Sequence, residues 1–103
     1  MTTLINQLRS KIAENQFEFS KHALDQSILR GITVQELREA IANGEVIEDY
    51  PDDKYGQSCL TFGMTKSSRP NHIQCSYPSR KVVKIISLYQ PDSEQWIDYK
   101  VRR

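Results

Sequence analysis

The sequence lacks several features that would assign it to a familiar class of protein. Its 103 residues include two cysteines, Cys59 and Cys75, which stand apart without a Cys-x-x-Cys or zinc spacing. No apolar run approaches the roughly 18 residues of a membrane span, and the N-terminus lacks the layout of a signal peptide. Glycine-rich nucleotide loops, Ser-His-Asp patterns and metal-ligand spacings are also missing. We therefore expect a cytoplasmic protein with free thiols, no cofactor or metal, and no membrane association.

What the sequence does contain is a strong asymmetry of charge. Residues 1–53 hold 5 Lys or Arg against 10 Asp or Glu, whereas residues 54–103 hold 9 against 3. The basic part suits a polyanion such as RNA and the acidic part suits a basic partner, although both can equally be solvated surface. The length predicts a single domain over residues 1–103.

Helical signals dominate the first part of the chain. Residues 2–15 carry apolar side chains at helical spacing. Residues 20–30 begin at a serine that can cap a helix and end before Gly31, which suits a left-handed stop. Residues 33–43 open with the capping box of Thr33 and Glu36. We expect three helices.

Strand-like runs follow the helices, and Pro, Ser and Gly residues punctuate them. The runs are residues 45–50, 58–65, 71–77 and 81–89. Because their connections are short, they predict a four-stranded antiparallel sheet, with the helices packed on one face. The last run is apolar on both faces and should be central. The tail begins like a helix, and Trp96 and Tyr99 should pack back on the domain. The predicted class is α+β.

The alternation of residue types indicates a register for the middle two strands. Pairing Leu60 with Cys75 and Phe62 with Ile73 places these apolar side chains on one face, which would be the core face. His72 then lies on the opposite face, which would be open and polar. Such a face beside basic loops can hold a nucleic acid backbone.

Three side chains are candidates for acid–base and anion-binding chemistry: His22, Arg30 and His72. His22 and Arg30 lie along one stripe of the second helix. An imidazole can move a proton near neutral pH, and a guanidinium can bind phosphate with two hydrogen bonds. We expect the three to meet across the boundary between helices and sheet. A surface or structural role is the alternative for each.

Further residues are candidates for substrate binding. Arg80, Lys81 and Lys84 lie at a strand turn and suit contact with phosphates. Tyr50, beside the turn at Pro51, can stack on a base or donate a proton. A solvated hairpin tip is the alternative for the three cations.

A series of short motifs resembles a bacterial family known as domain of unknown function 4258, over roughly residues 19–98. The motifs are His22-Ala23, Arg30-Gly31-Ile32, the capping box, residues 43–53, Arg69-Pro70-Asn71-His72, and residues 88–92 with Trp96. This chain has Gln26-Ser27 where the family usually has Arg-Met. The family is similar in layout to small ribonuclease toxins of the RelE, ParE and BrnT kind. The resemblance implies a RelE-like fold and a toxin role, with an antitoxin protein as partner.

Two functions follow from these observations. The first is a toxin-like, metal-independent endoribonuclease that uses His22 and His72 as base and acid and Arg30 and Arg80 to stabilise charge. The second is a non-catalytic module that binds protein or nucleic acid through a sheet face or edge. The missing arginine at position 26 and the low net charge favour the second.

Overall fold

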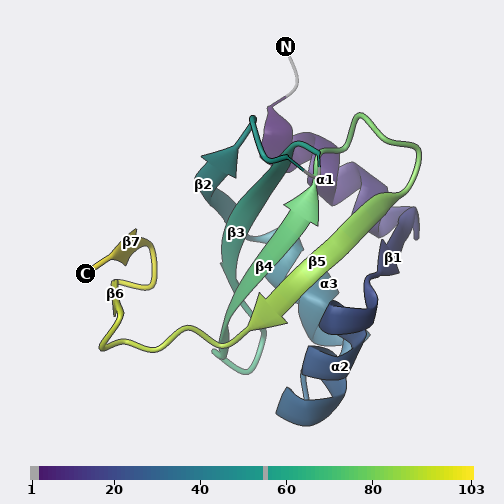
Figure 1. Cartoon of the computed structure of the whole chain (residues 1–103). Coiled ribbons are helices and arrows are strands. Elements are labelled where there is room, and N and C mark those ends of the chain that lie inside the picture. Colours follow the sequence, from purple (N-terminus) through teal and green to yellow (C-terminus); the bar gives the residue numbers. More distant parts are fainter. Residues whose placement is uncertain (1–2, 55) are drawn as a thin grey trace.

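In the part of the chain that the structure describes, residues 3–54 and 56–103, three helices pack on one face of a five-stranded sheet, and two further strands form a separate small sheet (Figure 1). The structure is a computed structural model. The helices are α1 (Leu4–Ala13), α2 (Lys21–Arg30) and α3 (Val34–Ala42). The large sheet contains β1 (Phe17–Phe19), β2 (Glu45–Tyr50), β3 (Ser58–Met64), β4 (Pro70–Ser76) and β5 (Val83–Tyr89). The small sheet contains β6 (Trp96–Ile97) and β7 (Val101–Arg102). The α+β class and the helix-covered face are confirmed.

The helices begin and end where local capping predicts. Ser20 accepts a backbone N–H at 3.0 Å at the start of α2, and Gly31 ends it with a φ of 63°. Thr33 and Glu36 form the predicted capping box of α3. Thr3 caps α1, which is shorter than predicted, and residue 2 lies outside the described residues. Of the helices seen here, none has the length and apolar character that a membrane crossing requires.

The large sheet is mixed, so the prediction of a four-stranded antiparallel sheet is wrong. The strand order is β1-β5-β4-β3-β2, and β1 runs parallel to β5, with Phe17 opposite Val83. β1 has three residues, too few to show the alternation that reveals a strand in a sequence. Phe17 and Phe19 hold it against the core. β5 is paired on both sides, as its apolar composition predicts.

The predicted register of β3 against β4 is wrong by one residue. Phe62 lies opposite His72 and not opposite Ile73, and Leu60 is displaced from Cys75 in the same way. Because side chains alternate along a strand, a shift of one residue moves each side chain of β3 to the other face. The helix-covered face therefore carries a different set of residues from the one predicted.

A close approach of α3 to β3 explains the observed register. A Cβ atom at Gly63 would lie 1.8 Å from the carbonyl oxygen of Ala40, so only glycine fits where the helix crosses the strand. The other side chains that β3 turns toward the helices, Cys59 and Thr61, are also small. The buried Thr61 hydroxyl donates a hydrogen bond to the Ile73 carbonyl at 3.0 Å, and this bond compensates for the loss of hydrogen bonds to water.

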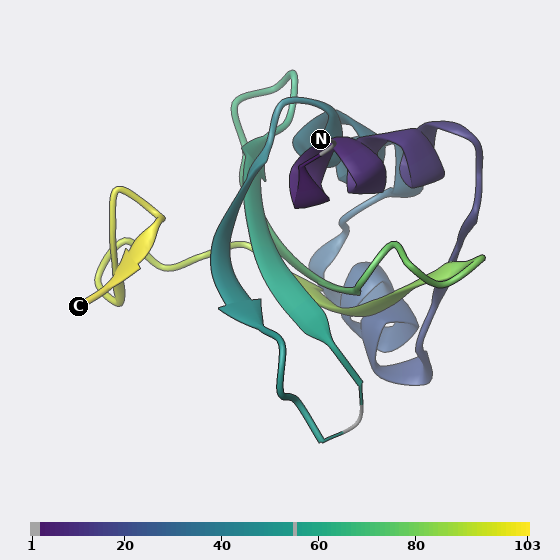
Figure 2. The same cartoon turned by 90° about the horizontal axis from the view of Figure 1, so that it is seen from above.

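The face of the large sheet turned away from the helices is called the outer face below. Its side chains on β2 to β5 include Glu45, Glu48, Tyr50, Ser58, Leu60, Phe62, His72, Gln74, Ser76, Lys84, Ser87 and Tyr89. Residues 91–103, called the C-terminal strap below, lie on this side. Figure 2 shows the strap and the helices on opposite sides of the sheet.

The strap packs on the outer face through its aromatic residues. It begins with a turn and not with the predicted helix, and β6 then pairs with β7. Trp96 is 4% exposed, and its ring centre lies 4.4 Å from that of His72. The Tyr99 ring lies 5.9 Å from the Phe62 ring. The prediction that Trp96 and Tyr99 pack back on the domain is confirmed.

Candidate active site

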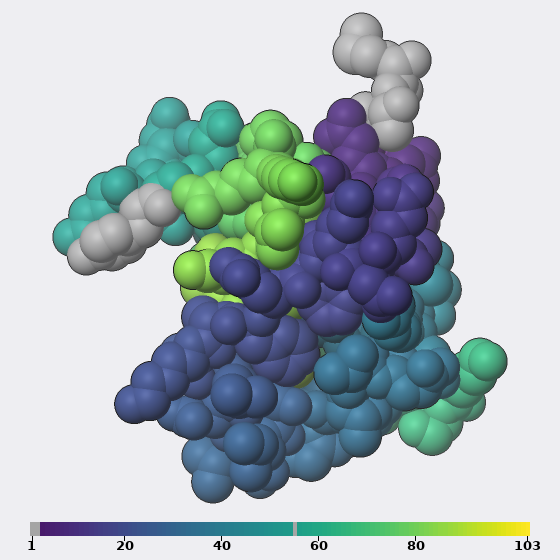
Figure 3. Space-filling model, turned by 90° about the vertical axis from the view of Figure 1, so that its right-hand side faces the viewer, coloured from purple at the N-terminus to yellow at the C-terminus, as the bar shows by residue number. Residues whose placement is uncertain are grey.

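The structure does not bring His22, Arg30 and His72 together. His22 and Arg30 are exposed on α2. Figure 3 shows the side of the molecule on which α2 lies. His72 belongs to the outer face, so the large sheet lies between it and α2. Gln26, at the position where the resembling family has arginine, faces inward, and its Oε1 accepts the Leu88 N–H at 2.9 Å. Gln26, which lies between His22 and Arg30 on one stripe of α2, therefore fastens the helix to β5.

His72 is buried and hydrogen-bonded at both ring nitrogens. Its Nε2 lies 2.6 Å from the carbonyl oxygen of Tyr99, which can only accept, so Nε2 carries the proton. Its Nδ1 lies 3.1 Å from the Tyr89 hydroxyl. Burial lowers the pKa of His72, although the Tyr99 carbonyl and the charge of Glu48 act in the other direction. His72 is thus a neutral side chain under the strap, and the predicted open polar setting is wrong.

Arg69, in the motif that contains His72, joins three elements. Its guanidinium donates to the carbonyls of Arg30 at 2.7 Å and Gly31 at 3.0 Å, and it lies 3.3 Å from the Glu36 carboxylate. Its Nε donates to Gln90 at 3.0 Å. Arg69 therefore ties the end of α2 to the start of α3 and to the segment after β5.

The predicted basic residues lie around the turn between β4 and β5. Arg80 and Lys84 line a hollow of ≈ 370 Å³ together with Asp53, and Lys84 also lies 3.9 Å from Glu18. Lys81 is exposed in the same turn. The arrangement gives one end of the outer face a group of cations near a carboxylate.

A hydrogen-bonded cluster of Glu48, Tyr50 and Arg102 lies at the other side of the outer face. Glu48 and Tyr50 are two residues apart on β2, and Arg102 comes from β7. Arg102 donates from Nε at 2.9 Å and from a terminal nitrogen at 3.2 Å to the two Glu48 oxygens. The Tyr50 hydroxyl donates to the same carboxylate. Arg102 also lies over the Trp96 ring, 4.6 Å from its centre.

The cluster shifts the acidity of each of its members. Burial alone would raise the pKa of Glu48, but the hydrogen bonds from Arg102 and Tyr50 outweigh it and lower the pKa. Burial and the bond to Glu48 raise the pKa of Tyr50 to about 12. The bonds to Glu48 and Tyr50 also raise the pKa of Arg102. At neutral pH the site therefore holds a carboxylate, a protonated phenol and a guanidinium.

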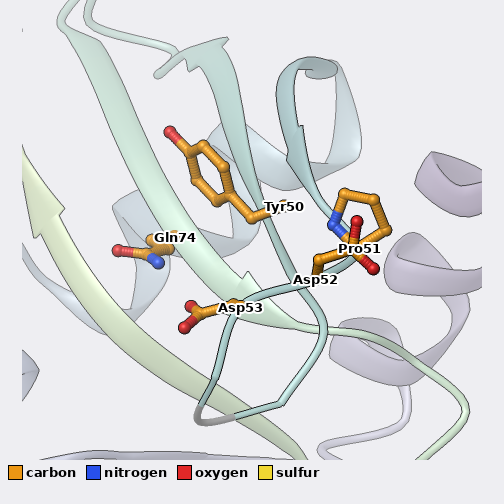
Figure 4. A pocket seen from close by; sticks show the side chains of 5 residues that line it. All are labelled: Tyr50, Pro51, Asp52, Asp53 and Gln74. Atoms are coloured by element: carbon orange, nitrogen blue, oxygen red, sulfur yellow. The ribbon is translucent and has the colours of Figure 1, made fainter.

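Next to the cluster is an open hollow of ≈ 520 Å³ lined by Tyr50, Pro51, Asp52, Asp53 and Gln74. In Figure 4 the side chains of Tyr50, Asp53 and Gln74 point to one side, and Asp52 points away from it.

A chain of hydrogen bonds orders the polar floor of this hollow. Ser87 donates to Gln74 Oε1, Gln74 Nε2 donates to Ser58, and Ser58 donates to Asp53, each at 3.3 Å. Because the single hydroxyl proton of Ser58 points to Asp53, Ser58 can only accept from Gln74, and this places Nε2 at that end of the amide.

The sequence indicated part of this cluster. Tyr50 was a predicted site residue, and Glu48 shares its face because the two are separated by one residue on a predicted strand. Arg102 gave no signal, since the tail was expected to be helical. In residues 3–54 and 56–103, no three His, Cys, Asp or Glu side chains gather in a way that could hold a metal ion.

Comparison with known proteins identifies the family and no further relative. Neither the curated proteins nor the solved structures contain a match to this chain. The family described as Domain of unknown function (DUF4258) matches residues 19–90. The match includes Glu48, Tyr50, His72 and Gln74 and ends just before the strap that supplies Arg102. Because it covers most of the chain, this protein belongs to the DUF4258 family.

Proposed function

We propose that this protein is an endoribonuclease that cleaves RNA without a metal ion, with the cluster of Glu48, Tyr50 and Arg102 as its active site. The observation that carries the proposal is that a carboxylate, a protonated phenol and a guanidinium are hydrogen-bonded to one another at the edge of an open hollow. Cleavage through the 2′-hydroxyl needs a base, an acid and a cation, and side chains supply all three here.

Each member of the cluster has a defined role in this proposal. Glu48 removes the proton from the 2′-hydroxyl, whose oxygen bonds to phosphorus. Arg102 stabilises the added negative charge on the phosphoryl oxygens. Tyr50 donates its proton to the 5′-oxygen as the bond from phosphorus to that oxygen breaks. The products are a 2′,3′-cyclic phosphate and a free 5′-hydroxyl. Arg80, Lys81 and Lys84 bind flanking phosphates.

We further propose a toxin role in the cytoplasm, with a RelE-like fold and an antitoxin protein as partner. The support for this part is the resemblance of the motifs to toxin-like ribonucleases, together with the acidic residues 1–53, which suit a basic partner.

The second candidate is a non-catalytic binding module, and one observation favours it. Arg102 and Trp96 belong to the strap, and their contacts with Glu48 and His72 also fasten the strap to the sheet. In that case the ion pair of Glu48 and Arg102 only holds the strap on the sheet, and the outer face binds a partner without catalysis.

Cleavage of a fluorescent RNA in the presence of EDTA separates the two candidates. We expect Glu48→Gln, Tyr50→Phe and Arg102→Lys each to lower the rate on the order of 10²-fold or more. The matched control is Glu45→Gln, because Glu45 pairs with Lys100 of the strap at 3.1 Å without joining the cluster. No cleavage by the wild-type protein would favour the binding module. If Glu48→Gln cleaved RNA at the wild-type rate and His22→Ala lost cleavage, the active site would be assigned to α2.

A further inference from the structure

We propose that the C-terminal strap is a switch, which docks on the outer face while His72 is neutral and leaves it when His72 is protonated. The docked strap brings Arg102 to Glu48 and so completes the cluster, whereas a released strap leaves the cluster without its guanidinium. The inference names the regulation of the proposed active site and in that respect rests on the proposed function. Docking itself is a property of the fold and can be measured without RNA.

The strap is held on the large sheet by side chains and not by a shared ladder of strands. Its two strands pair with each other in a sheet of their own. Within the described residues, the bonds that its backbone N–H groups make to backbone carbonyls, such as Trp96 to Asp92 and Arg103 to Gln95, end inside the strap. In Figure 1 the segment after β5 connects the strap to the large sheet. The strap can therefore leave without breaking a strand pairing of the large sheet.

The turn between β6 and β7 has a backbone that its residues disfavour. Asp98 and Tyr99 are both in the left-handed region, with φ of 52° and 61°. This region is costly for a bulky residue such as tyrosine. The same turn presents the Tyr99 carbonyl to His72 and the Tyr99 ring to Phe62. Contacts with the sheet thus offset an unfavourable turn, and release of the strap allows the turn to relax.

His72 is the contact through which a proton can act on the strap. Its side chain is fully buried, and the Trp96 ring of the strap lies edge-on to it. With the proton on Nε2 bonded to the Tyr99 carbonyl, Nδ1 accepts from the Tyr89 hydroxyl. A second proton would go to Nδ1, so the Tyr89 hydroxyl would have to turn round. The imidazolium would also be a charge out of contact with water, which is unfavourable.

The charged and titratable groups that face His72 come from β2, β5 and the strap. They are the Glu48 carboxylate, the Tyr89 hydroxyl and the Arg102 guanidinium. β3 and β6 add the rings of Phe62 and Trp96, which carry no charge. Burial is the largest effect and lowers the pKa of His72. The attraction of Glu48 for an imidazolium is offset in part by the repulsion of Arg102, to which Glu48 is bonded.

The docking equilibrium should therefore depend on pH. Release exposes His72 to water, where an imidazole has a pKa of about 6.5. Below that pH the released form takes up a proton that the docked form does not, so docking weakens as the pH falls. The docking constant should fall on the order of tenfold for each pH unit, until the docked imidazole is itself protonated. At neutral pH the strap stays docked.

The fluorescence of Trp96 reports the position of the strap, because it is the one tryptophan of the chain and is buried only while the strap is docked. We expect the emission maximum to move to longer wavelength as the pH falls from about 7 to about 5, with a midpoint below about pH 6. The far-ultraviolet circular dichroism should stay the same. The wavelength is measured and not the intensity, since a protonated histidine can quench a tryptophan that has not moved.

Two results of this titration would overturn the proposal. One is an emission maximum that stays constant down to about pH 5. The other is a shift that coincides with a loss of circular dichroism, because the large sheet would then be unfolding with the strap.

The two histidines of the chain supply a matched pair of variants. His72→Gln keeps a donor for the Tyr99 carbonyl but does not titrate, so its strap should stay docked down to about pH 5. His22→Gln removes the other imidazole, which is exposed on α2, and should shift as the wild-type protein does. If both variants shifted alike, His72 would not be the group that controls the strap.

The ion pair of Lys100 and Glu45 gives a variant that leaves His72 intact. The two side chains lie 3.1 Å apart, so Lys100→Gln removes a contact of the docked strap. Its midpoint should rise by up to about half a pH unit, because a weaker docking is overcome by a smaller proton uptake. A midpoint below that of the wild-type protein would contradict the proposal.

RNA cleavage measured over the same pH range separates the switch from the proposed function. Release of the strap without RNA cleavage at any pH would support the switch and reject the endoribonuclease. RNA cleavage with an emission maximum that does not change with pH would support the endoribonuclease and reject the switch.

Discussion

Glu48 and Tyr50 differ in acidity although one hydrogen bond joins them. The bonds from Arg102 and Tyr50 lower the pKa of Glu48 against the effect of burial, and the pKa of Tyr50 is raised to about 12. The acid and the base of the proposed reaction therefore have pKa values that lie far apart on either side of neutrality. A site of this kind keeps both groups in their reactive forms over a wide range of pH.

The pH dependence of RNA cleavage should reflect this separation. We expect kcat/KM to rise at acid pH as Glu48 loses its proton and then to stay level from about pH 6 to about pH 10. The measurement is a set of initial rates in buffers of constant ionic strength, for the wild-type protein and for Glu48→Gln. The change of kcat/KM at mildly acidic pH and at alkaline pH is then compared between the two proteins. A bell-shaped profile centred near pH 7 would contradict the assignment of Glu48 as the base and Tyr50 as the acid.

At the scale of the element, short-range signals were sufficient for the helices and insufficient for the sheet. A capping box or a left-handed glycine is recognised from neighbouring residues, so α2 and α3 could be predicted. The register depends on which face the helices cover, and both faces of β3 are largely shielded from solvent. Leu60 and Phe62 look like core residues, yet they lie on the outer face.

The candidate site, like the sheet, could be predicted from the sequence only in part. Tyr50 could be found because it ends a strand and precedes a turn, and Glu48 shares its face. Arg102 could not, because its position depends on how the strap folds back across the sheet. The burial of His72 under Trp96 was hidden for the same reason. Sequence patterns report local geometry, and these contacts join residues far apart in the chain.

The crossing of α3 over β3 gives a prediction about stability. Gly63→Ala should lower the free energy of unfolding by about 3 kcal/mol, because the new Cβ would meet the backbone of Ala40 and the helix would have to move. Gly31→Ala is the control. It also adds one methyl group, but nothing lies within 4 Å of it, and the left-handed backbone alone costs about 1 kcal/mol. Urea denaturation measures both, and equal losses would contradict the close approach.

At the scale of the whole molecule, the large sheet divides the surface into two sides with different parts. The helices occupy one side and the strap occupies the other (Figure 2). The cluster and the hollow lie on the side of the strap, because Glu48, Tyr50 and Gln74 belong to the outer face. Arg80 and Lys84 line the hollow of ≈ 370 Å³, which shares Asp53 with the hollow beside Tyr50, and Arg102 lies in the cluster beside the strap. An RNA strand that enters the cluster would pass between these cations, so its backbone should be confined to the outer face.

The salt dependence of RNA binding should reveal this confinement. The probe is a 2′-O-methyl oligonucleotide, which cannot be cleaved, bound to the full chain at several salt concentrations. Removing two phosphate contacts with the double variant Arg80→Gln, Lys84→Gln should reduce the slope of log K against log salt by about 1.4, at roughly 0.7 for each contact with a single strand. Arg30 at the end of α2 and Lys66 in the turn between β3 and β4 are exposed cations that line neither hollow. The double variant Arg30→Gln, Lys66→Gln removes the same charge from the chain, so a slope that changes equally in both pairs would show that net charge, and not a path along the outer face, governs binding.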